Sequence, residues 1–259
     1  MEGTGMETIT ATEIVTLCGQ VGTILLENGA ETARVENTVE YVGRAANLPV
    51  VCHATMTGIF VSSEKDAATR IFKVRVGDFN LQKVDDINTL SRQFYRHEIS
   101  FKKLKKEVQL VDHESRDFSW LVKCIGAGLV SMPPMLLFKA TWGDLFLAFF
   151  VGIIGYLISQ FVAHHNKTPY IPVALGSLAI SFIANVLGDV GIAHDANYII
   201  ISALMPLVPG VPMTNSLREI IERNTISGLV RATDAIMSGI SIGSGVIVGQ
   251  ILMRAIWGG

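Results

Sequence analysis

Charged residues are scarce in this sequence. Asp, Glu, Lys and Arg make up 17% of its 259 residues, against about 25% in average globular chains, and the mean hydropathy is +0.42. The shortage lies at one end, because residues 1–117 hold 14 basic and 17 acidic side chains whereas residues 118–259 hold only 7 and 6. We therefore expect a solvated N-terminal part joined to a lipid-compatible C-terminal part.

Cysteine is scarce, and the chain has no strong net charge. Cys18, Cys52 and Cys124 are odd in number and widely spaced, which argues against a disulfide framework and fits a reducing compartment. The net charge of −2, without a basic stripe, removes the usual basis for binding nucleic acid. The first residues lack the basic start and apolar run of a cleavable signal, so residues 1–117 are expected in the cytoplasm.

Motifs for catalysis are absent as well. The sequence has no P-loop, no Gly-x-Ser-x-Gly and no His-Glu-x-x-His, so neither ATP drive nor hydrolysis is supported. His164 and His165 are adjacent, which points their rings to different helix faces, and no third ligand is near them in the sequence. We predict no catalytic residues, no metal site and no cofactor, and do not expect an enzyme.

The N-terminal part, residues 1–117, is predicted to be a small α+β domain. Apolar residues recur at helical spacing in four stretches, and between the second and third lies a segment rich in Val, Thr, Ile and Phe, which is typical of a strand. A second, alternating strand, with Phe72, Val74 and Val76 on one face, is expected to pair with the first. The predicted helices cover 7–29, 31–47, 81–94 and 101–111, and the predicted strands cover 50–63 and 69–76.

A distinctive polar segment opens the second predicted helix. Glu31, Thr32 and Arg34 follow Gly29 and could form a polar site at the start of the helix. The alternative is an ordinary solvated first turn, in which the helix dipole favours Glu31. The sequence alone favours the solvated turn.

Five apolar segments follow the N-terminal part. Each reaches or nearly reaches the ~20 residues that cross a ~30 Å hydrocarbon layer as a helix, and ionisable residues lie near the segment ends. The alternative, a soluble core of buried helices, is disfavoured by the short loops. The predicted fold class is a polytopic α-helical membrane protein with an N-terminal cytoplasmic α+β domain. The transmembrane domain, residues 118–259, would have spans at 118–138, 142–163, 171–189, 196–213 and 230–257.

Loop charges predict the orientation in the plasma membrane. Positive charge favours the cytoplasmic side, so Lys167 and the polar loop 214–229 with Arg218 and Arg223 would lie inside, and Lys139 outside. The N-terminus would then be cytoplasmic and the C-terminus outside. In transporters, a repeat with an odd number of spans, whose two ends lie on opposite sides of the membrane, often pairs with a second repeat.

The fourth apolar segment carries a cluster of helix-breaking residues. Pro206, Pro209, Gly210 and Pro212 lie within seven residues, and each proline removes a backbone donor. Carbonyls freed in this way must face protein or a wet cavity, and broken helices in transporters offer such groups to substrates. We favour this interpretation, in which the broken segment lines a substrate path, and we expect Asn215 to lie on the same path. The alternative is that Pro206 only kinks the helix and Pro212 ends it.

The fifth apolar segment has a stripe of small and polar residues on one helix face. This face fits a polar path and close helix packing equally well. Gly239 and Gly243, on another face, indicate packing. The stripe consists of Asp234, Ser238, Ser241, Gly245 and Gly249.

The third apolar segment has a similar face. Ser177, Ser181 and Asn185 could line the same path, or could link neighbouring helices by hydrogen bonds. Asp189 follows at the segment end, as a residue at the mouth of the path or as an ordinary end charge.

Several motifs occur together along nearly the whole chain. Any one of them would be weak evidence, but the combination is specific. They are Gly29-Ala30-Glu31 with Arg34, Thr69-Arg70 in the second strand, the helix that contains Leu81, Leu207-Val208-Pro209-Gly210-x-Pro212-x-x-Asn215, and Asn224-Thr225-x-x-Gly228-Leu229-x-Arg231.

This combination resembles the threonine/serine exporter family, and within it the N-terminal-half subunit of the two-component members. The resemblance implies export of a small polar metabolite, either threonine and serine or a small dicarboxylate such as succinate. It also implies a second, smaller membrane subunit that matches the family's C-terminal half, and it is compatible with a higher oligomer. Where the family usually has an acidic residue after the Pro-Gly motif, this chain has Arg218-Glu219, so no role is carried over to either residue.

Two other classes of function remain open. The spans could anchor a cytoplasmic sensing or scaffold domain without transport. Residues 1–117 could also form an enzyme, which would require a cleft around Glu31 and Arg34. For an exporter coupled to protons or ions, Asp189 and Asp234 are the available titratable groups, although neither lies near mid-membrane.

Overall fold

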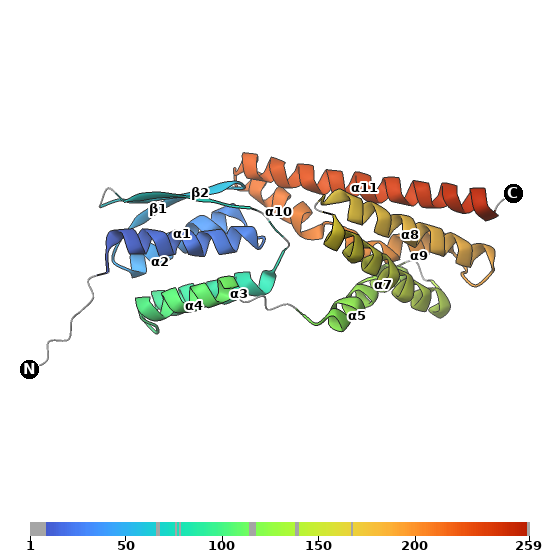
Figure 1. The fold of residues 1–259 in the computed structure, drawn as a ribbon, viewed down its shortest axis with the longest axis horizontal. Helices are drawn as coiled ribbons and strands as arrows, with labels where there is room; N and C mark the ends of the chain where they lie inside the picture. The colour runs from blue at the N-terminus through green and yellow to red at the C-terminus, as the bar shows by residue number, and fades with distance from the viewer. Residues whose placement is uncertain are drawn as a thin grey trace, which may run out of the picture. The chain divides into compact units, whose positions relative to one another are not determined.

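The computed structural model describes residues 9–65, 68–75, 77, 79–113, 118–137, 140–166 and 168–257 (Figure 1). It forms two compact units, which we describe separately. The first contains Met1–Arg116 and Val211–Ala232, and the second contains Asp117–Gly210 and Thr233–Gly259. The predicted strand end Val76 and the predicted loop cations Lys139 and Lys167 lie outside the described residues.

The first unit contains a three-stranded antiparallel sheet of order β1-β2-β3. Its strands are β1 (Val50–Thr55), β2 (Gly58–Ser63) and β3 (Thr69–Lys73). The single strand predicted over 50–63 is therefore wrong, because a two-residue turn divides it and Thr55 pairs with Gly58. Apolar and β-branched residues continue across the turn, which hid it from the sequence pattern.

The alternation predicted for the last strand is confirmed. Phe72 and Val74 face the core, whereas Ile71 and Lys73 are exposed. β3 pairs with β2, with Phe60 opposite Ile71. The sheet thus buries one face against helices, as expected for antiparallel strands with period-two patterning.

Four helices complete the N-terminal layers of this unit. α1 (Ala11–Glu27) and α2 (Thr32–Ala45) cover the sheet. α3 (Leu81–Tyr95) and α4 (Phe101–His113) pack on the other side of this helix pair (Figure 1). The middle layer is therefore enclosed from both sides, which explains why α1 buries residues around most of its circumference.

Two cysteines lie in this core and give a simple test of it. Burial raises the pKa of Cys18 to about 12, and burial together with the Glu36 charge raises that of Cys52 to about 12. Only about one thiol in 10,000 would then be thiolate at pH 8, the form that attacks maleimides. With the partly exposed Cys124 replaced by alanine, we expect the folded protein to resist maleimide at pH 8 and to be labelled after denaturation. Rapid labelling of the folded protein would contradict this core.

The described residues of the second unit form helices and the turns that connect them, with no strand among them. α7 (Trp142–His165) contacts α5 (Trp120–Val130), α8 (Tyr170–Asp189) and α9 (Ala196–Ala203). Small residues permit this packing: a Cβ on Gly155 would lie 2.3 Å from Ile180. The remaining elements are α6 (Pro133–Leu137), the 3-10 helix η1 (Met205–Leu207) and the part of α11 (Thr225–Trp257) from residue 233 onward.

Within the part of the chain that the structure describes, four helices are long and apolar enough to cross a membrane. A fifth candidate is the interrupted pair Ala196–Leu207 and Gly210–Ile221, so the structure supports four to five spans. The loop predicted at 214–229 is wrong, since α10 (Gly210–Ile221) and the start of α11 occupy it. Its polar residues are those of amphipathic helix faces that belong to the first unit, and not those of a solvated connection.

Candidate functional site

The connection between α1 and α2 is the centre of the polar site in the first unit. The amide of Gly29 donates to Leu26 and the amide of Ala30 donates to Leu25, which is the Schellman arrangement for ending a helix. Gly29 has a φ of +98°, and a Cβ there would lie 2.1 Å from Phe79. Glycine is therefore required to turn the chain from α1 into α2.

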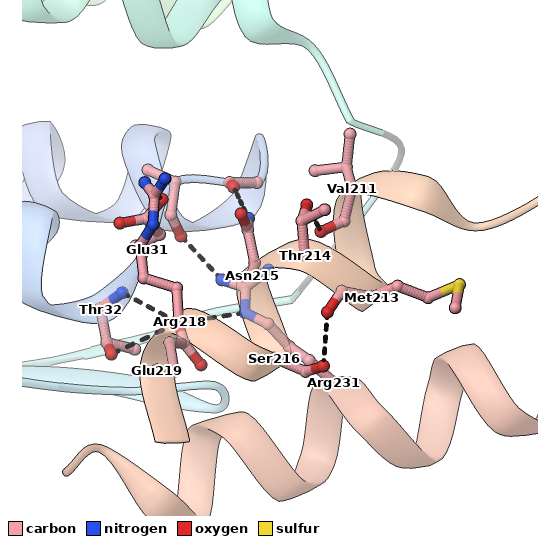
Figure 2. A network of polar contacts seen from close by, with 12 residues as sticks. Glu31, Thr32, Val211, Met213, Thr214, Asn215, Ser216, Arg218, Glu219 and Arg231 are labelled. Carbon is pink, nitrogen blue, oxygen red and sulfur yellow. Dashed lines mark hydrogen bonds and ion pairs between the residues drawn. The ribbon is translucent and has the colours of Figure 1, made fainter. Parts of the chain in front are cut away.

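Glu219 of α10 supplies the cap that α2 lacks. The N-cap residue of α2, Glu31, makes no capping bond with its own side chain. Instead Glu219 Oε1 accepts from the backbone N of Thr32, at 3.1 Å, and from its hydroxyl, at 3.4 Å (Figure 2). A carboxylate at the first turn is favoured by the unpaired amides and by the positive end of the helix dipole.

Arg231 of α11 pairs with the same carboxylate. Its Nε donates to Glu219 Oε1 at 3.2 Å, and its Nη2 donates to the carbonyl of Ala30 at 2.7 Å. Both side chains are buried, with 2% of Arg231 and none of Glu219 exposed. Burial of two charges costs desolvation energy that only paired and hydrogen-bonded groups can recover. An ion pair of this kind in a segment that can span a membrane is a candidate functional site.

Two outer contacts complete the arrangement (Figure 2). Asn215 Nδ2 donates to the carbonyl of Gly29 at 3.0 Å. Arg218 forms an ion pair with Glu31, in which the arginine is largely exposed. Three residues of α10 and one of α11 thus hold the connection between α1 and α2. We call this set the clamp, and it comprises Gly29, Ala30, Glu31, Thr32, Asn215, Arg218, Glu219 and Arg231.

The hairpin of α10 and α11 brings the two buried charges together. Gly228 of α11 lies against α10, where a Cβ would be 2.6 Å from Ile220 and 3.0 Å from the carbonyl of Ser216. The turn between the helices includes Arg223 with a φ of 67°. This close approach places Arg231 opposite Glu219.

The buried pair is not fully satisfied. Glu219 Oε2 and Arg231 Nη1 are buried without a hydrogen-bond partner among the residues that the structure describes. Buried polar groups are nearly always paired in folded proteins, so such a pair of atoms requires an explanation.

The structure gathers some of the predicted polar residues and separates others. Glu31, Thr32 and Asn215 meet in the clamp, whereas Arg34 lies on the exposed face of α2. The favoured interpretation of a solvated first turn is wrong for Thr32, which is 1% exposed. Its side chain is covered because it contacts Glu219, almost two hundred residues away.

The helix break predicted around Pro209 is present. Val208 is extended, with φ −69° and ψ 128°, between η1 and α10. α10 begins at Gly210, so Pro212 lies in its first turn, where a missing amide donor costs nothing. The alternative that Pro212 ends a helix is therefore wrong, because it lies at a helix start. The role of Pro209, Gly210 and Pro212 in a substrate path stays a prediction.

The polar faces of α8 and α11 contact each other in the second unit. Ser181 Oγ donates to the carbonyl of Val246 at 2.9 Å. Tyr170 donates to Asp234 at 3.1 Å. A Cβ on Gly249 would lie 2.6 Å from the carbonyl of Leu178. The two glycines of the stripe on α11, Gly245 and Gly249, therefore allow close packing against α8.

The other predicted path residues are bonded locally or exposed. Asn185 donates to the carbonyl of Ser181, one turn earlier in its own helix, and Ser241 bonds to Met237 in the same way. Asp189 is exposed at the end of α8, and Ser238 is half-buried in α11. Their place on a substrate path stays a prediction.

The interpretation of Gly239 and Gly243 as packing residues is wrong within the described part of this chain. A Cβ at either position would meet no atom within 4 Å. Gly245 and Gly249 take that role on α11, and spacing alone could not tell the two faces apart.

Sequence reasoning missed the buried pair itself. The sequence patterns assign no role to Arg218 or Glu219, and they place Arg231 in a family motif without indicating a partner for it. One signal was available: Asn215 and Glu219 are four residues apart and share a helix face. That signal requires residues 214–221 to be helical, which the loop interpretation excluded.

The fold comprises apolar helices that can span a membrane and an additional α+β unit. Residues 16–253 match the family described as "Putative threonine/serine exporter" (ThrE), and the chain belongs to this family, as the sequence motifs indicated. The apolar helices and the family fit a membrane location.

Two relatives match almost end to end. Both are named "Probable succinate transporter subunit YjjP". The protein from Escherichia coli (strain K12) is 25% identical over 257 residues, which cover 98% of each chain. The protein from Klebsiella aerogenes is 22% identical over 249 residues, 95% of this chain and 94% of that one. No solved structure matches the chain.

Proposed function

We propose that this protein is one subunit of a secondary exporter for a small polar metabolite that carries a carboxylate. The candidate substrates are threonine and serine, or a small dicarboxylate such as succinate. The chain would act with a second, smaller membrane subunit that supplies the other half of the path. Its N-terminus would be cytoplasmic and its C-terminus outside.

One observation carries this proposal: two relatives that match at least 94% of their length are named as subunits of a succinate transporter. The word subunit supports a partner, and the family description supports export of hydroxy amino acids. The interruption at Val208–Pro209, between apolar helices and a polar α10, supplies backbone groups of the kind that transporters offer to substrates.

Accumulation in cells tests the function. In a strain that lacks this gene but retains the partner, we expect intracellular succinate, threonine or serine to rise, and restoration of the gene to lower it. Unchanged levels of all three metabolites, with the partner expressed, would argue for a non-transporting membrane anchor instead.

Two substitutions test the broken segment. Pro209→Ala returns a backbone donor that would let the helix continue, and Asn215→Ala removes the bond to the Gly29 carbonyl. We expect each to lower efflux several-fold while membrane insertion stays normal. Met213→Ala, at an exposed position of the same helix, is the matched control. Full efflux in both variants would remove the broken segment from the mechanism.

A further inference from the structure

The guanidinium of Arg231 has donor capacity left over. Its Nε is taken by Glu219 and its Nη2 by the Ala30 carbonyl, whereas Nη1 has no partner among the described residues. An arginine side chain binds carboxylates through pairs of adjacent N–H groups. The remaining N–H groups of Arg231 therefore have the chemistry that binds a carboxylate.

Glu219 can give up this arginine without becoming isolated. The oxygen that accepts from Arg231 also accepts from the Thr32 amide and hydroxyl, at the N-terminus of a 14-residue helix. These groups and the helix dipole stabilise its negative charge. The second oxygen, Oε2, makes no bond to any residue that the structure describes. One anion can thus replace another on Arg231 while the displaced carboxylate keeps its bonds to Thr32.

We propose that Arg231 binds the carboxylate of the exported metabolite, and that Glu219 is the resident anion which this carboxylate displaces. The proposal rests on the proposed function and assigns its substrate site. Serine, threonine and succinate all carry the required group. When the metabolite leaves, Glu219 returns to Arg231 and restores the clamp.

The exchange also acts on the backbone of the clamp. Arg231 holds the Ala30 carbonyl, and Glu219 holds the Thr32 amide, on the two sides of Glu31. Loosening their mutual bond uncouples α10 from α11, while each of the two helices keeps its own bond to the α1–α2 connection. α10 follows directly on the helix break at Val208–Pro209, where the chain can absorb a change of direction.

The experiment measures efflux of labelled succinate, threonine and serine from proteoliposomes that contain both subunits. Glu219→Gln keeps the shape and the acceptor for Thr32 but removes the competing charge. We expect its KM to fall about tenfold, equivalent to about 1.4 kcal/mol, and its kcat to fall as well, because no anion returns to expel the substrate. Arg231→Gln should raise KM at least tenfold or abolish efflux.

Two double variants are controls. The first tests whether the protein folds without the buried charges, and the second tests whether loss of any ion pair changes KM. Glu219→Gln with Arg231→Gln leaves no unpaired buried charge, so it should fold and yet export none of the three metabolites. Glu40→Gln with Arg44→Gln removes an exposed ion pair of α2 that lies outside the clamp, and its KM should stay within twofold of wild type.

The outcomes separate this proposal from the function on which it rests. A wild-type protein that exports none of the three metabolites overturns both. Two other outcomes leave the exporter function intact. In the first, the wild type exports but the KM of Glu219→Gln is unchanged or raised. In the second, the wild type exports and the Glu219→Gln/Arg231→Gln variant has a normal KM. Either result would reduce the buried pair to a structural one and overturn the proposal.

Discussion

Arg231→Ala is expected to lower the free energy of unfolding by about 3–5 kcal/mol, since it removes the cation that pairs with the buried Glu219 and the donor to the Ala30 carbonyl. Glu219→Ala should cost a similar amount, because it strands the guanidinium and uncaps α2. The double variant should cost less than the sum of the two, since neither charge remains. The measurement is thermal denaturation of the purified protein in detergent.

The exposed pair of the clamp is the matched comparison for this prediction. Arg218 is 62% exposed at its side chain, and exposed ion pairs contribute only about 0–1 kcal/mol. Arg218→Ala should therefore shift the melting temperature slightly. If Arg231→Ala destabilised the protein no more than Arg218→Ala does, the buried pair would not hold the first unit together.

Gly245→Val is expected to disrupt the packing of α8 against α11. A Cβ at Gly245 would lie 2.1 Å from the hydroxyl oxygen of Ser177 and 2.2 Å from the carbonyl of Ala174. The backbone of α8 cannot move aside without loss of its own hydrogen bonds, and overpacking of this kind typically costs 1–3 kcal/mol or more. We expect a large loss of monodisperse protein in size-exclusion chromatography and a lower melting temperature.

Gly243→Val provides the control on the same helix. It introduces the same side chain at a position where a Cβ meets no atom within 4 Å among the described residues. Its yield and melting temperature should match those of the wild-type protein. Equal behaviour of the two valine variants would mean that α8 and α11 do not approach each other at Gly245.

Much of the fold was accessible from local patterns. The spacing of apolar residues located α1 and α2, and the length of an apolar run located α7, each to within a few residues. The hairpin of β1 and β2 was missed since its turn, Met56-Thr57, contains no glycine or proline.

The site was less accessible, because it depends on contacts between distant residues. Thr32 and Glu219 are 187 positions apart, and no local pattern can report such a pairing. The exposed polar character of residues 214–229 favoured a loop, whereas tertiary packing selects a helical hairpin that buries Glu219 and Arg231. Such buried polar pairs violate local rules, and functional sites are where sequence patterns are expected to fail.

The measurement that tests the account most directly is efflux from proteoliposomes loaded with labelled succinate, threonine or serine. Vesicles with both subunits should release at least one of these metabolites faster than vesicles with either subunit alone. Equal, background release from all three preparations, with both proteins inserted and folded, would contradict the assignment of this chain as an exporter subunit.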